Sequence, residues 1–186
     1  HNKPYKMLWV TLGQHYISRL NSNISPCSHC YSRIGLSKSQ SVIDAAIGPM
    51  LGNFTSVAQG ETTGTLAMTY FDGLDGHLKA LAVGRADAPT TGAAPVTLDD
   101  GLDVGRFCSA GVRPGTPDLF AAYYDAHAQA LKLAHWDGVS SPTNAFVDGV
   151  KIGTDSAIAV TSTHVVVAYY NSTEEDLRLA RWPRIG

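Results

Sequence analysis

One motif occurs twice in this chain almost letter for letter. It spans residues 123–136 and returns at residues 169–182: two tyrosines, an Asp or Asn, and six residues later the segment Leu-Lys/Arg-Leu-Ala-x-Trp. A weaker copy begins at Tyr70-Phe71-Asp72, so the first tyrosines are 53 residues apart (70 to 123) and then 46 (123 to 169). Periods of this length are typical of repeat architectures. The repeat therefore constrains the fold more than any other feature.

Each copy divides into short apolar segments separated by turn-forming residues. In the second copy the segments are residues 107–112, 119–124, 131–136 and 145–147. The breaks are rich in Pro, Gly, Asp and Ser, which initiate turns and interrupt hydrogen-bonded ladders. Strand-sized segments bounded in this way predict four antiparallel strands per unit.

The first and third copies follow the same scheme. The first divides into residues 54–58, 66–71, 78–83 and 96–98, whereas the third supplies only residues 157–160, 165–170 and 177–182. We therefore expect the fourth strand of the third unit to be missing. Every copy opens with a hydrophobic residue and a glycine, where we expect the backbone to bend sharply: Leu51-Gly52, Val104-Gly105 and Ile152-Gly153.

The pattern resembles the blade repeat of β-propeller proteins, which is common in secreted and extracellular chains. The resemblance covers about residues 40–182 and rests on G-x-x-x-S, an apolar strand ending in Y-Y-D or Y-Y-N, and L-K/R-L-A-x-W. It implies four-stranded blades around a central channel, and closed propellers have about four to eight blades. This chain holds about three. We expect an all-β fold of about three four-stranded antiparallel propeller-like blades, incomplete without a partner strand or chain.

A spare strand at the start of the repeat region complements the short third unit. Ser41-Val42-Ile43-Asp44 resembles the fourth strands that end at Asp99 and Asp148, but it precedes the first full copy. Pairing between chains would satisfy edges that otherwise invite uncontrolled association. The hypothesis is a ring or head-to-tail fibre assembled through two strands, represented by Ser41, Val42 and Ile43 on one side and Leu177, Leu179 and Trp182 on the other.

The chain divides into two parts. Residues 40–186 form the β-repeat domain, with copies at about 49–101, 102–149 and 150–186, and residues 1–39 form an N-terminal arm or hairpin. The arm has three equivalent interpretations: it packs on the repeats, donates a strand to a neighbour, or hangs free.

Composition excludes some partners and indicates a compartment. The net charge is -2 and the 14 Lys and Arg residues are scattered, which argues against nucleic acid. No apolar run approaches the roughly 20 residues of a membrane span. Three Asn-x-Ser/Thr sequons, at Asn23, Asn53 and Asn171, favour a secreted, extracellular glycoprotein; the alternative is that they arise by chance, because Ser and Thr are abundant in this chain.

Three cysteines leave several outcomes open. Cys27 and Cys30 form a C-x-x-C pair that suits Zn²⁺, but a second pair of ligands is not evident, so we expect neither a metal nor a cofactor. In a secreted chain we expect a disulfide from Cys27 to Cys30, or from one of them to Cys108. Alternatively, Cys108 is a buried thiol within its apolar segment.

Recurring aromatic and acidic residues are the candidate ligand-binding groups. Asp72 and Asp125 follow two aromatics in each repeat, and exposed Tyr70, Tyr123 or Tyr169 would be suited to stack on sugars. The alternative is structural: Asp and Asn at strand ends cap turns, and one ring of each pair packs in the core while its neighbour is exposed.

No catalytic arrangement stands out. The chain shows no recognisable Ser, His and Asp set, no paired acids in a known setting, no phosphate-binding loop, and no Asp-box of the propeller sialidases. We therefore do not expect an enzyme. The expected function is that of an extracellular structural or adhesive subunit that assembles with copies of itself by strand complementation; the alternatives are a lectin-like carbohydrate-binding module and a fragment of a propeller hydrolase.

Overall fold

The computed structural model describes residues 51–60, 65–85, 88–89, 94–149 and 152–183. The proposed arm (1–39) and the spare strand Ser41-Val42-Ile43 lie outside the described residues.

Every regular element described is a β-strand, which confirms the all-β expectation. In chain order the strands are β1 (Leu51–Gln59), β2 (Thr65–Asp72), β3 (His77–Arg85), β4 (Ala88–Pro89), β5 (Val96–Asp99), β6 (Val104–Val112), β7 (Leu119–Asp125), β8 (Ala130–Trp136), β9 (Thr143–Asp148), β10 (Ile152–Val160), β11 (His164–Asn171) and β12 (Asp176–Pro183).

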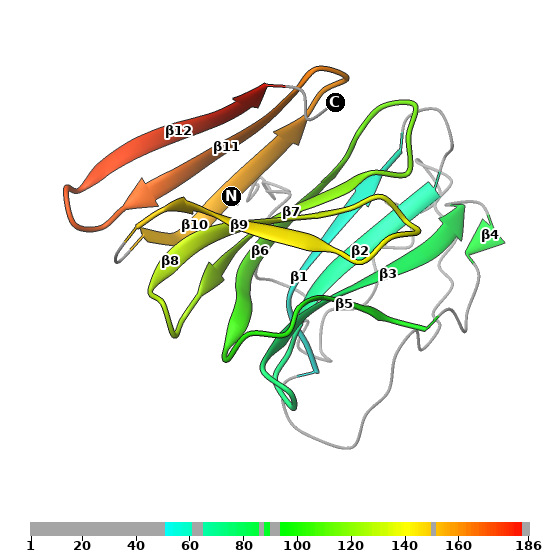
Figure 1. Cartoon of the computed structure of the whole chain (residues 1–186), viewed down its shortest axis with the longest axis horizontal. Coiled ribbons are helices and arrows are strands. Elements are labelled where there is room, and N and C mark those ends of the chain that lie inside the picture. Colours follow the sequence, from blue (N-terminus) through cyan, green and yellow to red (C-terminus); the bar gives the residue numbers. More distant parts are fainter. Residues whose placement is uncertain (1–50, 61–64, 86–87, 90–93, 150–151, 184–186) are drawn as a thin grey trace, which may run out of the picture.

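The strands form three antiparallel sheets, one for each copy of the repeat. The first sheet has the order β1-β2-β3, with β5 along one part of the outer edge of β3 and the short β4 along another. The second sheet is a four-stranded meander, β6-β7-β8-β9, and the third is β10-β11-β12. The prediction of four antiparallel strands is thus confirmed for the second unit, and the first adds the two-residue β4. The three sheets stand side by side in an open array (Figure 1).

The first strand of each sheet begins earlier than the sequence predicted. The ladder between β6 and β7 starts at Val104 and shifts register between Val104 and Arg106 and again between Arg106 and Ser109. β1 has two matching shifts, and β10 has one shift, between Ile152 and Ser156. A bulge of this kind bends the strand while pairing continues, so apolar alternation locates the strand but misses its first residues.

The core lies between the sheets. One buried cluster joins the first and second sheets and includes Leu78, Ala80, Leu119 and Tyr123. A second cluster joins the second and third sheets: Phe120, Ala122, Leu131, Leu133, Ile152, Val165, Val167 and Tyr169. The second sheet is therefore covered on both faces, which explains why β7 is buried from its first residue to its fifth.

Hydrogen bonds join the innermost strands of neighbouring sheets. Strand β6 lies between β1 and β10 (Figure 1). The backbone N–H of Ala110 donates to Ser56 Oγ at 3.0 Å, and the hydroxyls of Ser109 and Ser156 are 3.4 Å apart. Small polar side chains at these positions allow the inner strands to approach closely.

Candidate functional site

A buried polar cluster connects the first sheet to the second. Asp99, at the end of β5, accepts a hydrogen bond from the Tyr123 hydroxyl at 2.5 Å and another from Lys132 Nζ. Its second oxygen accepts the Gly101 backbone N–H at 2.9 Å. Tyr123 is fully buried and Asp99 is nearly so. One oxygen of the carboxylate is thus engaged by two groups from the second sheet, and the other by the turn that follows β5.

The same cluster recurs between the second and third sheets. Asp148 ends β9 and accepts a hydrogen bond from the Tyr169 hydroxyl at 2.8 Å. Arg178 Nη1 lies 3.3 Å from the same carboxylate oxygen. In both junctions, an Asp from the fourth strand of one sheet binds the tyrosine and the basic residue of the next sheet. Asp99 and Asp148 occupy equivalent positions in the sequence, but this role could not be predicted there, because their partners are distant in sequence.

The ionisation of these groups follows from their partners. Burial by itself would raise the pKa of Asp99, but the hydrogen bonds from Lys132 and Tyr123 outweigh it and hold the pKa below its usual value. Burial and the neighbouring carboxylate of Asp148 raise the pKa of Tyr169 to about 12. Each cluster therefore contains an ionised Asp, a basic residue and a neutral tyrosine. Their hydrogen bonds and ion pair hold one sheet against the next.

The recurring acids act as turn caps. Asp125 Oδ1 accepts the Ala128 N–H at 2.7 Å, and Asp72 Oδ1 accepts the Leu74 N–H at 2.9 Å. Asn171 accepts the N–H of Thr173 at 2.9 Å in the equivalent turn. All three are buried. Their geometry is that of the structural alternative in the sequence analysis, and ligand binding by these acids stays a prediction.

Burial also restricts the glycan and sugar-stacking predictions. Tyr123 and Tyr169 are the buried members of their aromatic pairs, whereas Tyr70 and Phe71 are both buried, so the expectation of one exposed ring is wrong for the first pair. Stacking on a sugar would require each of the three tyrosine rings to leave the core. Asn171 is only 2% exposed, and a glycan there would require its side chain to leave the turn. Asn53 is exposed on β1, whereas Asn23 lies outside the described residues.

Cys108 lies inside the first junction. Its thiol donates a hydrogen bond to the Phe54 carbonyl of β1, and its sulfur is 3.4 Å from Thr69 Oγ1. Burial raises the pKa of this thiol to about 12, so it is protonated at neutral pH. Cys27 and Cys30, its predicted disulfide partners, lie outside the described residues.

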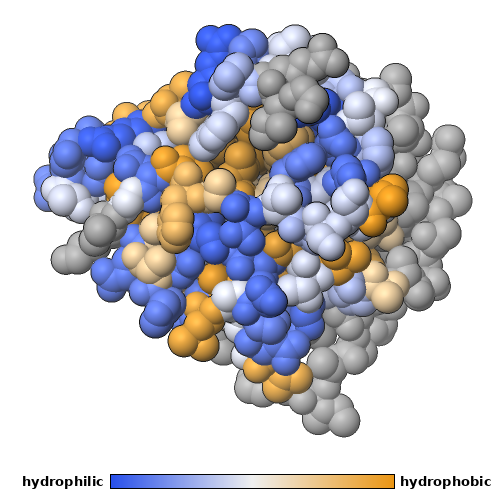
Figure 2. Space-filling view, in the orientation of Figure 1, coloured by the Kyte–Doolittle hydropathy of each residue, from blue (hydrophilic) through white to orange (hydrophobic). Residues whose placement is uncertain are grey.

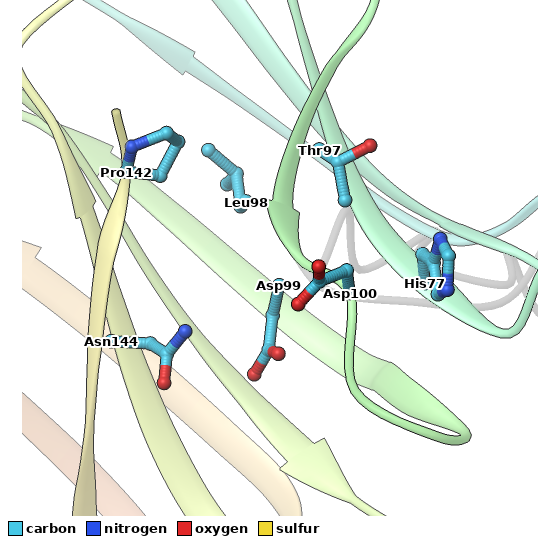
Figure 3. Close-up of a pocket in the computed structure, with 7 residues that line it drawn as sticks. All are labelled: His77, Thr97, Leu98, Asp99, Asp100, Pro142 and Asn144. Carbon is cyan, nitrogen blue, oxygen red and sulfur yellow. The ribbon is translucent and has the colours of Figure 1, made fainter. Parts of the chain in front are cut away.

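A hollow of about 340 Å³ opens beside the first polar cluster, between the outer edges of the first two sheets (Figure 3). It is lined by His77, Thr97, Leu98, Asp99, Asp100, Pro142 and Asn144. Asp99 is already bonded to Lys132 and Tyr123. The hollow therefore offers a few exposed polar groups but no activated nucleophile, and the described part of the chain contains no cluster of metal-ligating side chains.

The outward face of the third sheet is the largest difference between the repeats. This outer face includes the side chains of the third sheet that point away from the second: Ala157, Ala159, His164, Val166, Ala168, Tyr170, Leu177, Leu179 and Arg181. Leu177 is 80% exposed and Leu179 is 66% exposed. Figure 2 shows hydrophobic residues interrupting the polar surface in several places.

The equivalent leucines in the other two sheets are covered. Leu78 and Leu131 precede the basic residue of their strands, as Leu177 does, and both are fully buried by the following sheet. Leu133, the equivalent of Leu179, is 7% exposed. Trp182, also assigned to assembly from the sequence, lies on the opposite face and packs towards the second sheet.

Comparison with known proteins found no protein-family model and no curated protein that matches this chain. The described residues form no helix long and apolar enough to cross a membrane. The candidate site thus rests on the molecule's own internal repetition, and its best-defined feature is the uncovered outer face of the third sheet.

Proposed function

We propose that this chain is an extracellular structural or adhesive subunit that assembles with copies of itself through the third sheet. The observation that carries the proposal is the exposure of Leu177, 80%, against complete burial of Leu78 and Leu131 at the equivalent positions. The sheet face that carries this leucine is covered by the next sheet in the first and second repeats, but it is uncovered in the third.

The hydrophobic effect favours covering this face. Full burial of a leucine side chain is worth about 1.5–3 kcal/mol, and Leu177 and Leu179 lie on one face of β12 beside Tyr170 and Ala168. Exposed apolar patches on sheet surfaces mark interaction sites. The outer face is thus suited to receive another sheet of the same kind.

The edge of β12 offers a second mode of contact. Within the described ranges β12 pairs only with β11, so its other edge presents backbone donors and acceptors. Such an edge is a template for an added strand. Strand addition beside β12 and sheet packing on the outer face together would extend the propeller-like array into a ring or fibre.

The burial of Tyr70, Tyr123 and Tyr169 favours assembly over the lectin-like alternative, because none of the three rings is exposed and Tyr123 and Tyr169 are already bonded across the sheet junctions. Exposed Asn53 suits an extracellular, glycosylated chain.

The test is the oligomeric state across a range of protein concentration, measured by sedimentation velocity and light scattering. The wild-type chain is expected to associate, and Leu179→Asp is expected to shift it to monomer by placing a charge on the outer face. Leu102→Asp is the matched control, because Leu102 is 69% exposed in a turn of the second repeat. A wild-type chain that stays monomeric throughout, or equal effects of the two variants, would overturn the proposal.

A further inference from the structure

Glycines mark the closest approach between neighbouring sheets. A β-carbon on Gly105 would lie 2.8 Å from the Leu78 β-carbon, and one on Gly153 would lie 2.7 Å from the Leu131 β-carbon. Real β-carbons do not approach other atoms so closely. In both junctions, the glycine that opens one sheet therefore sits directly on the leucine of the preceding sheet.

One glycine and one leucine of the repeat lack this contact. Gly52 opens the first sheet, and a β-carbon there would meet no atom within 4 Å. Leu177 is the equivalent leucine of the third sheet and is 80% exposed. The first sheet thus carries the glycine half of a junction, and the third sheet carries the leucine half.

A second position in the inner strands shows the same asymmetry. The small donor three residues after the glycine bonds or contacts the preceding sheet in both junctions: Cys108 donates to the Phe54 carbonyl, and Ser156 lies 3.4 Å from Ser109. Thr55 occupies this position in the first sheet, where it is exposed and donates to the Gly52 carbonyl of its own strand at 2.7 Å.

We infer that the first sheet of one copy docks on the third sheet of another, with Gly52 seated on the partner's Leu177. This inference rests on the proposed self-assembly and names the surface that the outer face receives. The contact is heterologous, because it joins two different surfaces, and its repetition generates a ring or a fibre. A face-to-face dimer of two third sheets would instead leave Gly52 uncovered.

The rest of the first sheet is compatible with this docking. Leu66 and Met68 on its outward face are only partly buried, whereas Tyr70 and Leu81 are buried. In the second sheet the equivalent tyrosine, Tyr123, is bonded by the fourth strand of the preceding sheet through Asp99. The open part of the first sheet therefore lies along β1, from Gly52 to Val57, which is 52% exposed and pairs with Met68, and we expect a docked third sheet to contact it there.

The decisive experiment uses two variants, each of which disrupts only one of the two contacting surfaces. Leu177→Asp removes the leucine half, and Gly52→Asn adds a side chain to the glycine half, with Asn chosen because it tolerates a positive φ. Each variant alone is expected to be monomeric. Mixed together, they are expected to form a one-to-one heterodimer that grows no further, because Gly52 of the first variant and Leu177 of the second remain intact.

The control for the added side chain is Gly138→Asn. Gly138 has a φ of +87°, close to the +77° of Gly52, but it lies in a turn where a β-carbon would meet only Pro117 at 3.5 Å. This variant is expected to associate as the wild type does, and thermal unfolding checks that all three variants are folded.

The outcomes separate the two proposals. A monomeric wild type overturns self-assembly itself. If the wild type associates but the mixed variants form no heterodimer, or Gly52→Asn associates as tightly as Gly138→Asn, self-assembly stands and the head-to-tail contact of Gly52 with Leu177 is wrong.

Discussion

Gly153 lies against Leu131 so closely that a β-carbon in its place would come within 2.7 Å of the leucine β-carbon. Its φ of +98° independently favours glycine. The hydrophobic-Gly pair at the start of the second and third repeats is therefore more than a bend, because it is where one sheet contacts the preceding one.

The first prediction separates these two requirements for glycine. In the Leu177→Asp background, which is expected to be monomeric, Gly52→Ala should lower the free energy of unfolding only through backbone strain, by about 1–2 kcal/mol, because the surroundings of Gly52 are open. Gly153→Ala should cause backbone strain as well and also overpack the junction, which adds about 1–3 kcal/mol to the loss of unfolding free energy. Urea unfolding of both variants measures the difference; equal losses of unfolding free energy would contradict the close contact.

The second prediction concerns the buried hydrogen bond between Tyr123 and Asp99. Tyr123→Phe removes one of the donors that hold the buried carboxylate, which should lower the free energy of unfolding by about 1–3 kcal/mol. Tyr124→Phe is the matched control on the same strand, because Tyr124 is half-buried and less enclosed. The measurement is chemical denaturation, and a loss no larger than the control's would show that Asp99 does not depend on Tyr123.

The third prediction is a loss of stability in acid. Although burial opposes it, hydrogen bonding from Lys132 and Tyr123 lowers the folded-state pKa of Asp99 below its unfolded value of about 3.9. The ionised group therefore stabilises the fold above that unfolded pKa, and this contribution is lost as the pH falls through the folded pKa. The pKa of Asp148 is also lowered, chiefly by the hydrogen bond from Tyr169.

Urea unfolding at a series of pH values below about 5 tests this dependence. Asp99→Asn is expected to be less stable at neutral pH and to show a flatter acid limb, since one of the titrating groups is gone. An acid limb as steep as that of the wild type would contradict the role assigned to Asp99.

The fourth prediction is that the Cys108 thiol is inert in the folded protein. Burial raises its pKa to about 12, and its sulfur lies between two sheets. In a Cys27→Ser, Cys30→Ser background, which leaves Cys108 as the one thiol, a disulfide reagent at pH 8 should label the chain only after denaturant is added. Rapid stoichiometric labelling of the native protein would mean that the junction opens readily.

The fifth prediction distinguishes two sequons by exposure. In a eukaryotic secretory host, Asn53 is expected to carry a glycan because its side chain is exposed, whereas Asn171 is expected to remain unmodified in the folded chain because its side chain is buried and accepts a hydrogen bond from the turn that it caps. Peptide mass spectrometry before and after glycosidase treatment measures the occupancy of each. Full occupancy at Asn171 would show that glycosylation precedes formation of that turn.

Much of the fold was predictable because strands and turns are local. Alternating apolar residues placed β7, β8, β11 and β12 to within about one residue of each end, as period-two patterning allows. The fourth strand and the turn caps were also visible in the sequence. The early starts of β1, β6 and β10 were not, because a bulge breaks the alternation on which the prediction depends.

The candidate site was less predictable. The bonds from Asp99 to Lys132 and from Asp148 to Tyr169 join residues 33 and 21 positions apart. No local pattern pairs them, and only the packing of one sheet on the next brings them together.

The sequence by itself determined a repeating all-β chain, the number of strands in its second unit and the residue types at each recurring position. It assigned Leu78, Leu131 and Leu177 to the same place in three copies. Only the tertiary structure decided that the first two are fully buried and the third is 80% exposed. The reason is physical: local sequence sets which face of a strand a side chain occupies, but burial depends on whether another sheet covers that face.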